Sequence, residues 1–430
     1  MNITVDAKKT LLVDGPASIT VTSGRVEVFG HIMDKGKVII RDGKRMPFIV
    51  LENATFDVSL GENACVEEVQ GSTIPESWVK AFEELRSIKS RPAVAMVVGA
   101  PDSGKTSFCT YLINRLLTSK PKIAILDGDL GQSDIGPPCT VSYTLVSKPI
   151  ADLFNLEPEN AFFVGVTSPN KALEKTVQGL TLLRDEILQK SPDFIIVNTD
   201  GWIEGEDAVK YKAQLAERLF PDIIFAIKQD ERLTPLLDTI KIYRVLTIDS
   251  PNAIKQRSRE KRKSLRELGY LKYLKNAKVQ SIPLSWVRIE DGEHVALARN
   301  FVDSRRKREI SELLRVNPLH FAESMDKVFL VLGSDRYIPK EDLRKLEEAI
   351  GKKAVVVFKE EAEGLLTALY DSGNKFLGIG VIREVDYKRK VMKICTPVLG
   401  GISAIKIGKV RLDKNLREYP FSEEGPKQAS

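Results

Sequence analysis

The feature that most constrains this chain is a glycine-rich loop set between an apolar strand and a helix. Residues 99–107 read GAPDSGKTS, directly after the apolar run 93–98 and before the helix-like stretch 105–117. In this setting the pattern G-x-x-x-x-G-K-[ST] is typical of a phosphate-binding loop, whose backbone N–H groups and helix N-terminus face the phosphates. The motif therefore predicts a nucleoside triphosphate site on an α/β sheet.

Each residue type in this loop has an expected place. Lys105 would reach the β- and γ-phosphates, and the Thr106 hydroxyl would ligate Mg2+. No N-K-x-D sequence that would select guanine is present, since Asn170-Lys171 is followed by Ala-Leu-Glu, so we expect ATP rather than GTP. The predicted nucleotide-binding residues are Gly99, Ala100, Pro101, Asp102, Ser103, Gly104, Lys105, Thr106 and Ser107.

Patterns on either side of the loop divide the 430 residues into three predicted domains. Residues 1–88 alternate apolar and polar positions between turn signals, which is typical of a β-sandwich or barrel, and end in a helix. Residues 89–277 alternate strands and helices, as in a parallel sheet covered by helices. Residues 278–430 return to short strands with one clear helix at 340–350. We therefore predict an α/β fold, a central P-loop parallel sheet flanked by a β-sandwich-like N-terminal domain and a β-rich mixed C-terminal domain.

The central sheet is expected to hold six strands. They are residues 93–98, 123–126, 161–166, 194–197, 223–227 and 243–248.

Acidic residues follow two of these strands. Asp127 and Asp129 lie in DGDLGQ (127–132), and carboxyl ends of parallel strands meet at the edge where ligands bind. An Asp there can hold Mg2+ or accept a proton from an attacking hydroxyl, so both are candidate metal ligands beside Thr106. Asp200 is a competing metal acid, because many P-loop ATPases keep theirs after the equivalent strand. The pattern leaves the division of labour open.

Trp202 follows that same strand in a glycine-flanked loop, NTDGWIEG. An indole near a phosphate site can stack on a nucleobase with little regard to its identity. The plain alternative is that Trp202 is a packing residue. On the residues alone the two interpretations weigh equally.

The positive charge of the chain is concentrated in residues 255–275. This segment carries nine Lys or Arg against two Glu, whereas the whole chain has a net charge of +6. Arg259, Arg262, Lys263 and Arg266 share one helical face by their spacing. Such a segment can form an arginine-bearing lid over the γ-phosphate, the bland alternative being a solvated charged helix.

The sequence disfavours several other classes of site and location. The four cysteines are isolated and the three histidines scattered, which disfavours a disulfide framework or a histidine metal cluster. No run of 18 apolar residues occurs and the N-terminus lacks a signal-peptide core, so we expect no membrane partner. A cytosolic or nuclear protein is expected, and we take cytoplasmic as the prediction.

The ordered set of motifs resembles the polynucleotide 5′-hydroxyl kinase family, which includes the kinase of the eukaryotic pre-mRNA cleavage and tRNA-splicing machinery and its archaeal relatives. The matching segments are GAPDSGKTS (99–107), DGDLGQ (127–132), FFVGVTSP (162–169), TDGW (199–202) and the spacing of Arg257, Arg262 and Arg266. The domain order matches as well, so the resemblance spans most of the chain.

The resemblance implies roles for these residues. Lys105 would contact the transferring phosphate, and Asp129 would activate the 5′-hydroxyl. Asp127 stands where some relatives have Glu, so the better Mg2+ partner of the two stays open. The remaining implied residues are Gln132, Thr167, Ser168 and Trp202 on the substrate, and Arg257, Arg262 and Arg266 in the lid.

The expected activity is ATP-dependent phosphorylation of the 5′-hydroxyl of RNA, with DNA as a further candidate substrate. Its cofactors would be ATP and Mg2+ or another divalent cation, and RNA-processing proteins are candidate partners. Two alternatives stay open, an ATP-bound scaffold of an RNA-processing complex without transfer activity and a P-loop ATPase assembly factor that uses Asp200. The complete set of lid arginines favours catalysis.

Overall fold

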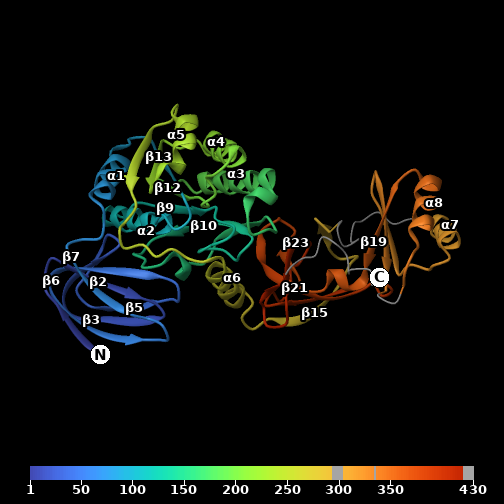
Figure 1. Cartoon of the computed structure of the whole chain (residues 1–430), viewed down its shortest axis with the longest axis horizontal. Coiled ribbons are helices and arrows are strands. Elements are labelled where there is room, and N and C mark those ends of the chain that lie inside the picture. Colours follow the sequence, from blue (N-terminus) through green and yellow to red (C-terminus); the bar gives the residue numbers. More distant parts are fainter. Residues whose placement is uncertain (293–303, 334–335, 420–430) are drawn as a thin grey trace. The chain divides into compact units, whose positions relative to one another are not determined.

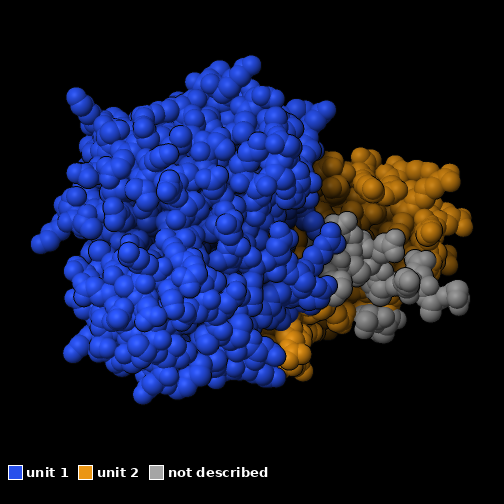
Figure 2. Space-filling model, turned by 60° about the vertical axis from the view of Figure 1, so that its left-hand side comes forward, with its two compact units in different colours: residues 1–164, 168–269 blue, residues 165–167, 270–430 orange. Residues whose placement is uncertain are grey.

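The computed structural model describes residues 1–292, 304–333 and 336–419 of the chain. The chain divides into two compact units (Figure 2). One is formed by Met1–Val164 and Ser168–Gly269, and the other by Gly165–Thr167 and Tyr270–Ser430. The first unit holds both the N-terminal sheet and the P-loop. The three-domain division predicted from the sequence stays a prediction.

The N-terminal sheet has seven strands in the order β4-β3-β6-β2-β7, with β1 paired to β6 and β5 to β3. Its strands are β1 (Asn2–Val5), β2 (Lys9–Asp14), β3 (Ala17–Val28), β4 (His31–Met33), β5 (Gly36–Ile40), β6 (Arg45–Leu60) and β7 (Val66–Gln70). The long strands β3 and β6 each serve two partners along their length, so the sheet folds over on itself. Their alternating apolar side chains fill a core that is continuous with helices of the P-loop region.

The central sheet has the strand order β11-β10-β9-β12-β8-β13-β14. Its strands are β8 (Ala93–Gly99), β9 (Ile123–Asp127), β10 (Thr140–Val146), β11 (Asn160–Phe163), β12 (Phe194–Asn198), β13 (Ile223–Lys228) and β14 (Val245–Asp249). From β9 to β14 the neighbours are parallel, as expected of strands buried on both faces. β8 is central, so the P-loop leaves the middle of the sheet.

The edge of this sheet differs from the sequence prediction. β10 and β11 are antiparallel, and β10 had no counterpart among the expected strands. Its residues Thr140, Ser142 and Thr144 are buried polar side chains, which break the apolar pattern that marks a central strand. β11 covers only the first half of the expected strand 161–166.

Helices cover both faces of the central sheet. They are α1 (Glu76–Ser87), α2 (Lys105–Leu116), α3 (Leu173–Gln189), α4 (Glu206–Leu219) and α5 (Thr234–Ile240), followed by α6 (Arg259–Tyr273) in the basic segment. α1 and α2 pack between the two sheets, whereas α3 and α4 lie on the other face of the central sheet (Figure 1). The helix α2 thus runs from the P-loop into the core shared with the N-terminal sheet.

The second unit is built from two sheets. The larger has the order β15-β22-β21-β20-β23-β16 with β24 on β23, and the smaller is β17-β18-β19. The elements are β15 (Lys278–Pro283), β16 (Arg288–Glu290), α7 (Ser304–Leu314), β17 (His320–Glu323), β18 (Lys327–Leu332), α8 (Lys340–Ile350), β19 (Lys353–Phe358), β20 (Leu365–Tyr370), β21 (Phe376–Asp386), β22 (Val391–Thr396), β23 (Ala404–Leu412) and β24 (Glu418–Tyr419). Among the described residues no helix has the length and apolar character to cross a membrane.

Candidate active site

The P-loop joins β8 to α2 at the carboxyl edge of the central sheet. Gly104 has a φ of 97°, a left-handed conformation that favours glycine, and it directly precedes the first residue of α2. A Cβ on Gly99 would stand 2.7 Å from the Ser103 hydroxyl and 3.0 Å from the Ile227 carbonyl. Glycine is therefore favoured at both positions, at Gly104 by its left-handed backbone and at Gly99 by the close packing around it.

Lys105 is buried, with its side chain folded back over the loop. Its ammonium donates to the carbonyl oxygens of Gly99 at 3.0 Å and Ala100 at 2.8 Å. Burial lowers the pKa of Lys105 to about 8, and the nearby Asp129 carboxylate opposes that shift. The Lys105 ammonium thus lies inside the P-loop, where the phosphates are also expected to bind.

Asp127, at the end of β9, organises the turn that follows it. Its Oδ1 accepts the Asn198 side-chain amide at 3.0 Å, and its Oδ2 accepts the backbone N–H of Asp134 at 2.9 Å and of Ile135 at 3.3 Å. Burial, reinforced by the neighbouring carboxylates of Asp134 and Asp129, raises the pKa of Asp127 to about 7. Both oxygens of Asp127 therefore already hold protein donors.

Asp129 is different, because only one of its oxygens serves the turn. Its Oδ1 accepts the backbone N–H groups of Gly131 at 3.0 Å and Gln132 at 2.9 Å. In the described part of the chain, Oδ2 has no hydrogen-bond donor. Burial and the Asp200 carboxylate raise the pKa of Asp129, whereas Lys105 acts against them. Of the two carboxylates on this turn, Asp129 is the one with an oxygen to offer.

Asp200 is engaged in a buried network. Its Oδ1 accepts the Trp202 backbone N–H at 2.9 Å, and its Oδ2 accepts the Tyr211 hydroxyl at 3.0 Å and the Lys212 ammonium at 2.8 Å. Lys212 is fully buried on α4 and donates also to the Asp200 carbonyl at 2.9 Å. This carboxylate ties the 199–202 loop to α4, a role that sequence reasoning missed because α4 follows several residues later.

The same loop brings Trp202 beside the P-loop. A Cβ on Gly201 would stand 2.7 Å from the Pro101 nitrogen, so the two loops touch backbone to backbone at this point. The Trp202 indole stacks on the Tyr211 ring with centroids 5.9 Å apart and planes 30° apart. Trp202 is half-buried, so its ring is supported by Tyr211 and keeps accessible surface.

The basic segment approaches the P-loop through Asp102. The Arg262 guanidinium lies 2.8 Å from Asp102 Oδ2, and the Arg257 guanidinium lies 3.7 Å from Oδ1. Gln132 donates from its side-chain amide to the Arg262 carbonyl at 3.0 Å. Two of the three predicted lid arginines and Gln132 therefore meet at the P-loop.

The other predicted residues are placed less closely. Arg266 lies one turn beyond Arg262 on α6, and its exposure is intermediate. Thr106 follows Lys105 in the first turn of α2. Thr167 and Ser168 follow β11 and are half-buried, but Thr167 belongs to the second unit and Ser168 to the first. The roles of these four residues stay predictions.

The polar groups at the carboxyl edge of the central sheet fit a nucleotide bound together with Mg2+. Ser103 in the P-loop has a buried hydroxyl without a hydrogen-bond partner among the described residues, as expected of a cradle for an acceptor-rich ligand. The described residues contain no cluster of three or more His, Cys, Asp or Glu that could hold a metal ion. Mg2+ in phosphoryl-transfer sites needs only one or two protein oxygens beside the phosphates and water, and Thr106 and Asp129 can supply them.

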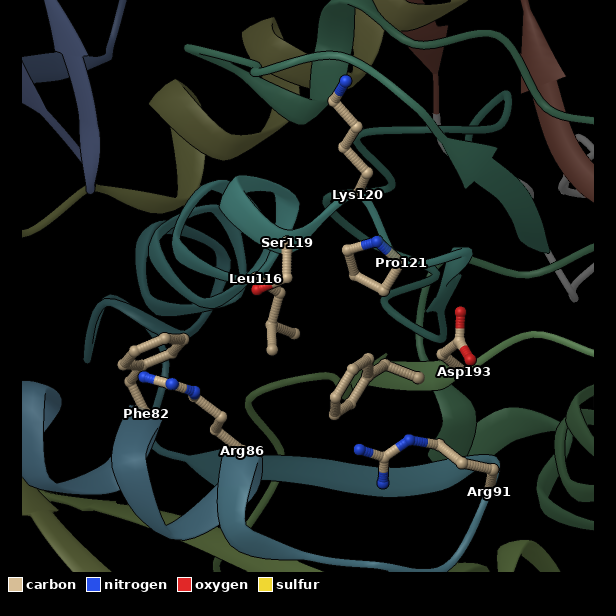
Figure 3. Close-up of a pocket in the computed structure, with 9 residues that line it drawn as sticks. Phe82, Arg86, Arg91, Leu116, Ser119, Lys120, Pro121 and Asp193 are labelled. Carbon is tan, nitrogen blue, oxygen red and sulfur yellow. The ribbon is translucent and has the colours of Figure 1, made fainter.

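A cavity of about 440 Å3 lies at the opposite edge of the central sheet (Figure 3). Its lining combines Phe82 and Phe194 with Arg86, Arg91 and Lys120. The helices α1 and α2 end here, and the Arg91 guanidinium donates to the carbonyls of Ile88 and Ser90. Cations at helix C-termini complement the helix dipoles, so their presence has a structural explanation and this cavity is not the phosphate site.

A P-loop, an acidic residue with an oxygen to offer and two arginines of the basic segment meet at the carboxyl edge of one parallel sheet. This arrangement defines the class of P-loop phosphotransferases. Within that class, the family model described as mRNA cleavage and polyadenylation factor CLP1 P-loop matches residues 99–276.

Curated relatives align with this chain over a longer stretch than the family model does. The polyribonucleotide 5′-hydroxyl-kinase of Pyrococcus furiosus is 30% identical over 348 residues, 80% of this chain and 94% of the relative. That of Methanocaldococcus jannaschii is 31% identical over 357 residues, with the same coverage of 80% and 94%. The chain belongs to this family of polyribonucleotide 5′-hydroxyl kinases, which confirms the resemblance seen in its motifs.

The fold is confirmed by a solved structure of Clp1p bound to a Pcf11p fragment. It superposes with a TM-score of 0.66 over 96% of this chain and 97% of that chain, at 14% identity. At that identity the likeness shows the shared architecture alone.

Proposed function

We propose that this chain is an ATP-dependent polynucleotide 5′-hydroxyl kinase that transfers the γ-phosphate of ATP to the 5′-hydroxyl of RNA, with DNA as a second substrate to be tested. The family relationship supports the reaction type. The observation that carries the proposal is the meeting of four elements at one sheet edge: the P-loop with Lys105, the 129–132 turn, the Trp202 loop and the basic segment.

Each residue of the site has a proposed role in binding or in phosphate transfer. The P-loop backbone and Lys105 would bind the phosphates, and the Thr106 hydroxyl would hold Mg2+, whose charge would neutralise that of the phosphates. Asp129 Oδ2 accepts the proton of the attacking 5′-hydroxyl. Arg257, Arg262 and Arg266 stabilise the charge that develops on the transferring group. Asp127 acts through the turn, since its oxygens already accept protein donors.

Trp202 forms the wall on which the terminal base stacks. Its ring is fixed by Tyr211 below and by the Asp200 carboxylate at its backbone N–H. Stacking tolerates any base, which suits an enzyme that acts on ends of varied sequence. Ser168 and Gln132 are proposed to contact the same terminal nucleotide. A substrate role for Thr167, RNA-processing partner proteins and a cytoplasmic location remain predictions from the sequence.

The proposal is tested by incubating the protein with ATP labelled at the γ-phosphate and a 5′-hydroxyl oligoribonucleotide. We expect label on this RNA and none on the same RNA carrying a 5′-phosphate, because the acceptor oxygen is then blocked. Lys105→Ala should abolish the transfer. ATP binding without label on any oligonucleotide would instead support the scaffold alternative, and ATP hydrolysis that ignores RNA would support the assembly ATPase.

The ATPase alternative receives no support from Asp200. A metal acid needs a free oxygen, whereas both oxygens of Asp200 hold hydrogen bonds within the protein. The contacts of the lid arginines at the P-loop likewise favour catalysis over passive nucleotide binding.

A further inference from the structure

Asp102 is an unusual residue for the middle of a phosphate-binding loop. Its side chain is 7% exposed, and its carboxylate would add negative charge next to a triphosphate. Its φ of 55° is left-handed, a conformation in which Asp and Asn are the best tolerated of the side-chain-bearing residues. A residue that is both strained and charged at a phosphate site calls for a compensating role.

The hydrogen bonds that the Asp102 carboxylate accepts indicate this role. Its Oδ2 accepts the backbone N–H of Arg257 at 3.0 Å and a terminal N–H of the Arg262 guanidinium at 2.8 Å. The Arg257 guanidinium is the next cation, 3.7 Å from Oδ1. One buried carboxylate thus contacts the segment both at its backbone and at two arginine side chains.

Other contacts of the segment reach the N-terminal sheet. Lys261 pairs with Asp42 at 2.5 Å and Lys255 with Asp14 at 2.5 Å, both on the N-terminal sheet and its β5–β6 turn. The Arg257 Nε donates to the Gly43 carbonyl at 3.2 Å. These contacts attach the segment to the N-terminal sheet, whereas Asp102 is the one of these acidic partners that lies in the P-loop. It is therefore the group that relates the arginines to the phosphates.

We propose that Asp102 is a positioning residue that sets the Arg257 and Arg262 side chains over the γ-phosphate. This inference rests on the proposed kinase function. A guanidinium has five N–H donors, and Asp102 takes one of them from Arg262, which leaves the others in a fixed fork for phosphate oxygens. The positive charge of the two arginines also offsets the Asp102 charge beside the nucleotide.

The test uses Asp102→Asn, because Asn has the same shape and tolerates the same left-handed backbone. The substitution removes the charge and replaces one acceptor oxygen by an amide group, while the size and shape are kept. We expect kcat to fall about tenfold or more while the KM for ATP changes by less than about threefold, since the lost ordering acts on the transition state. An Asp102→Asn protein with kcat equal to or above wild type would overturn the proposal.

Two further measurements separate positioning from a general loss of structure. In an Arg262→Gln background, Asp102→Asn should lower kcat by a smaller factor than it does in the wild-type background, because part of its effect acts through that arginine and the rest through Arg257; fully additive losses would contradict this. Trypsin should also cut faster after Arg257 and Arg259 in Asp102→Asn than in wild type. Unchanged cleavage would show that Asp102 does not hold the segment.

Asp42→Asn is the matched control. It also removes an acidic partner of the segment, but the Lys261–Asp42 pair is half-exposed and touches neither arginine. We expect wild-type kcat from it, and a loss equal to that of Asp102→Asn would overturn the special role of Asp102. If the wild-type protein transferred no phosphate, the proposed function would fail while the trypsin comparison still judged the contact.

Discussion

Trp202 illustrates how a single residue obtains its position from several others. The sequence predicted a ring near the phosphates but left stacking and packing equally weighted. The structure shows that the indole is supported on one face by Tyr211 and that its loop touches the P-loop at Gly201 and Pro101. These contacts join residues of different loops and helices, so no local pattern could reveal them.

The proposed stacking of the terminal base on Trp202 predicts a selective defect. Trp202→Ala should raise the KM for an oligonucleotide by about tenfold, since stacking contributes roughly 1–3 kcal/mol per base, and should leave the KM for ATP nearly unchanged. Steady-state kinetics with each substrate varied in turn measure this. Trp286→Ala is the control, because that indole is 77% exposed and belongs to the second unit. Equal effects of the two substitutions would rule out base stacking on Trp202.

The buried pair of Lys212 and Asp200 predicts a large loss of stability. Lys212→Met leaves the Asp200 carboxylate buried without its cation, which should lower the free energy of unfolding by about 3–5 kcal/mol. Urea denaturation measures the change. Adding Asp200→Asn should restore part of the loss, because the uncompensated charge is then gone. A Lys212→Met protein as stable as wild type would show that this ion pair does not stabilise the fold.

At the scale of elements, the sequence predicted what depends on local pattern. β8, the P-loop and α2 follow from apolar runs, glycines and helix-forming residues, and their predicted bounds agree within a residue or so with the structure. β10 was missed because buried Thr and Ser interrupt its apolar pattern. The attachment of the basic segment to Asp102 was missed as well, because a charged run shows no sign of its partner.

The β17 strand of the second unit carries a pH prediction. Burial, with help from the nearby charges of Lys307 and Lys390, lowers the pKa of His320 to about 4 from its ordinary value of 6.5. As the pH falls from about 6.5 to about 4, the unfolded chain gains a proton that the folded unit does not. The free energy of unfolding should therefore decrease over this window.

His320→Gln should flatten this dependence, because the ring that titrates only in the unfolded chain is removed. Equilibrium denaturation at pH 7 and pH 5, followed by a probe in the second unit, measures the difference. A variant with the same pH slope as wild type would assign the slope to other groups.

At the scale of the whole molecule, the N-terminal sheet does more than precede the catalytic region. Its core is continuous with α1 and α2, and its β5–β6 turn holds the basic segment through Asp42 and Gly43. Arg41 of the same turn donates to Asp152 and Asp134, and Asp134 belongs to the turn that Asp127 organises. Sequence patterns predicted the β-rich character of this sheet but not its contacts with two parts of the site.

The proposed kinase mechanism requires that the γ-phosphate leave ATP only to enter a 5′-hydroxyl. The most direct measurement counts ADP and 5′-phosphorylated RNA in the same reaction, with wild type and with Asp129→Asn. We predict one ADP for each RNA 5′-phosphate in wild type, and a loss of both products by a factor of about 100 or more in Asp129→Asn with ATP binding retained. ADP formed without RNA phosphorylation, or an active Asp129→Asn protein, would contradict the account.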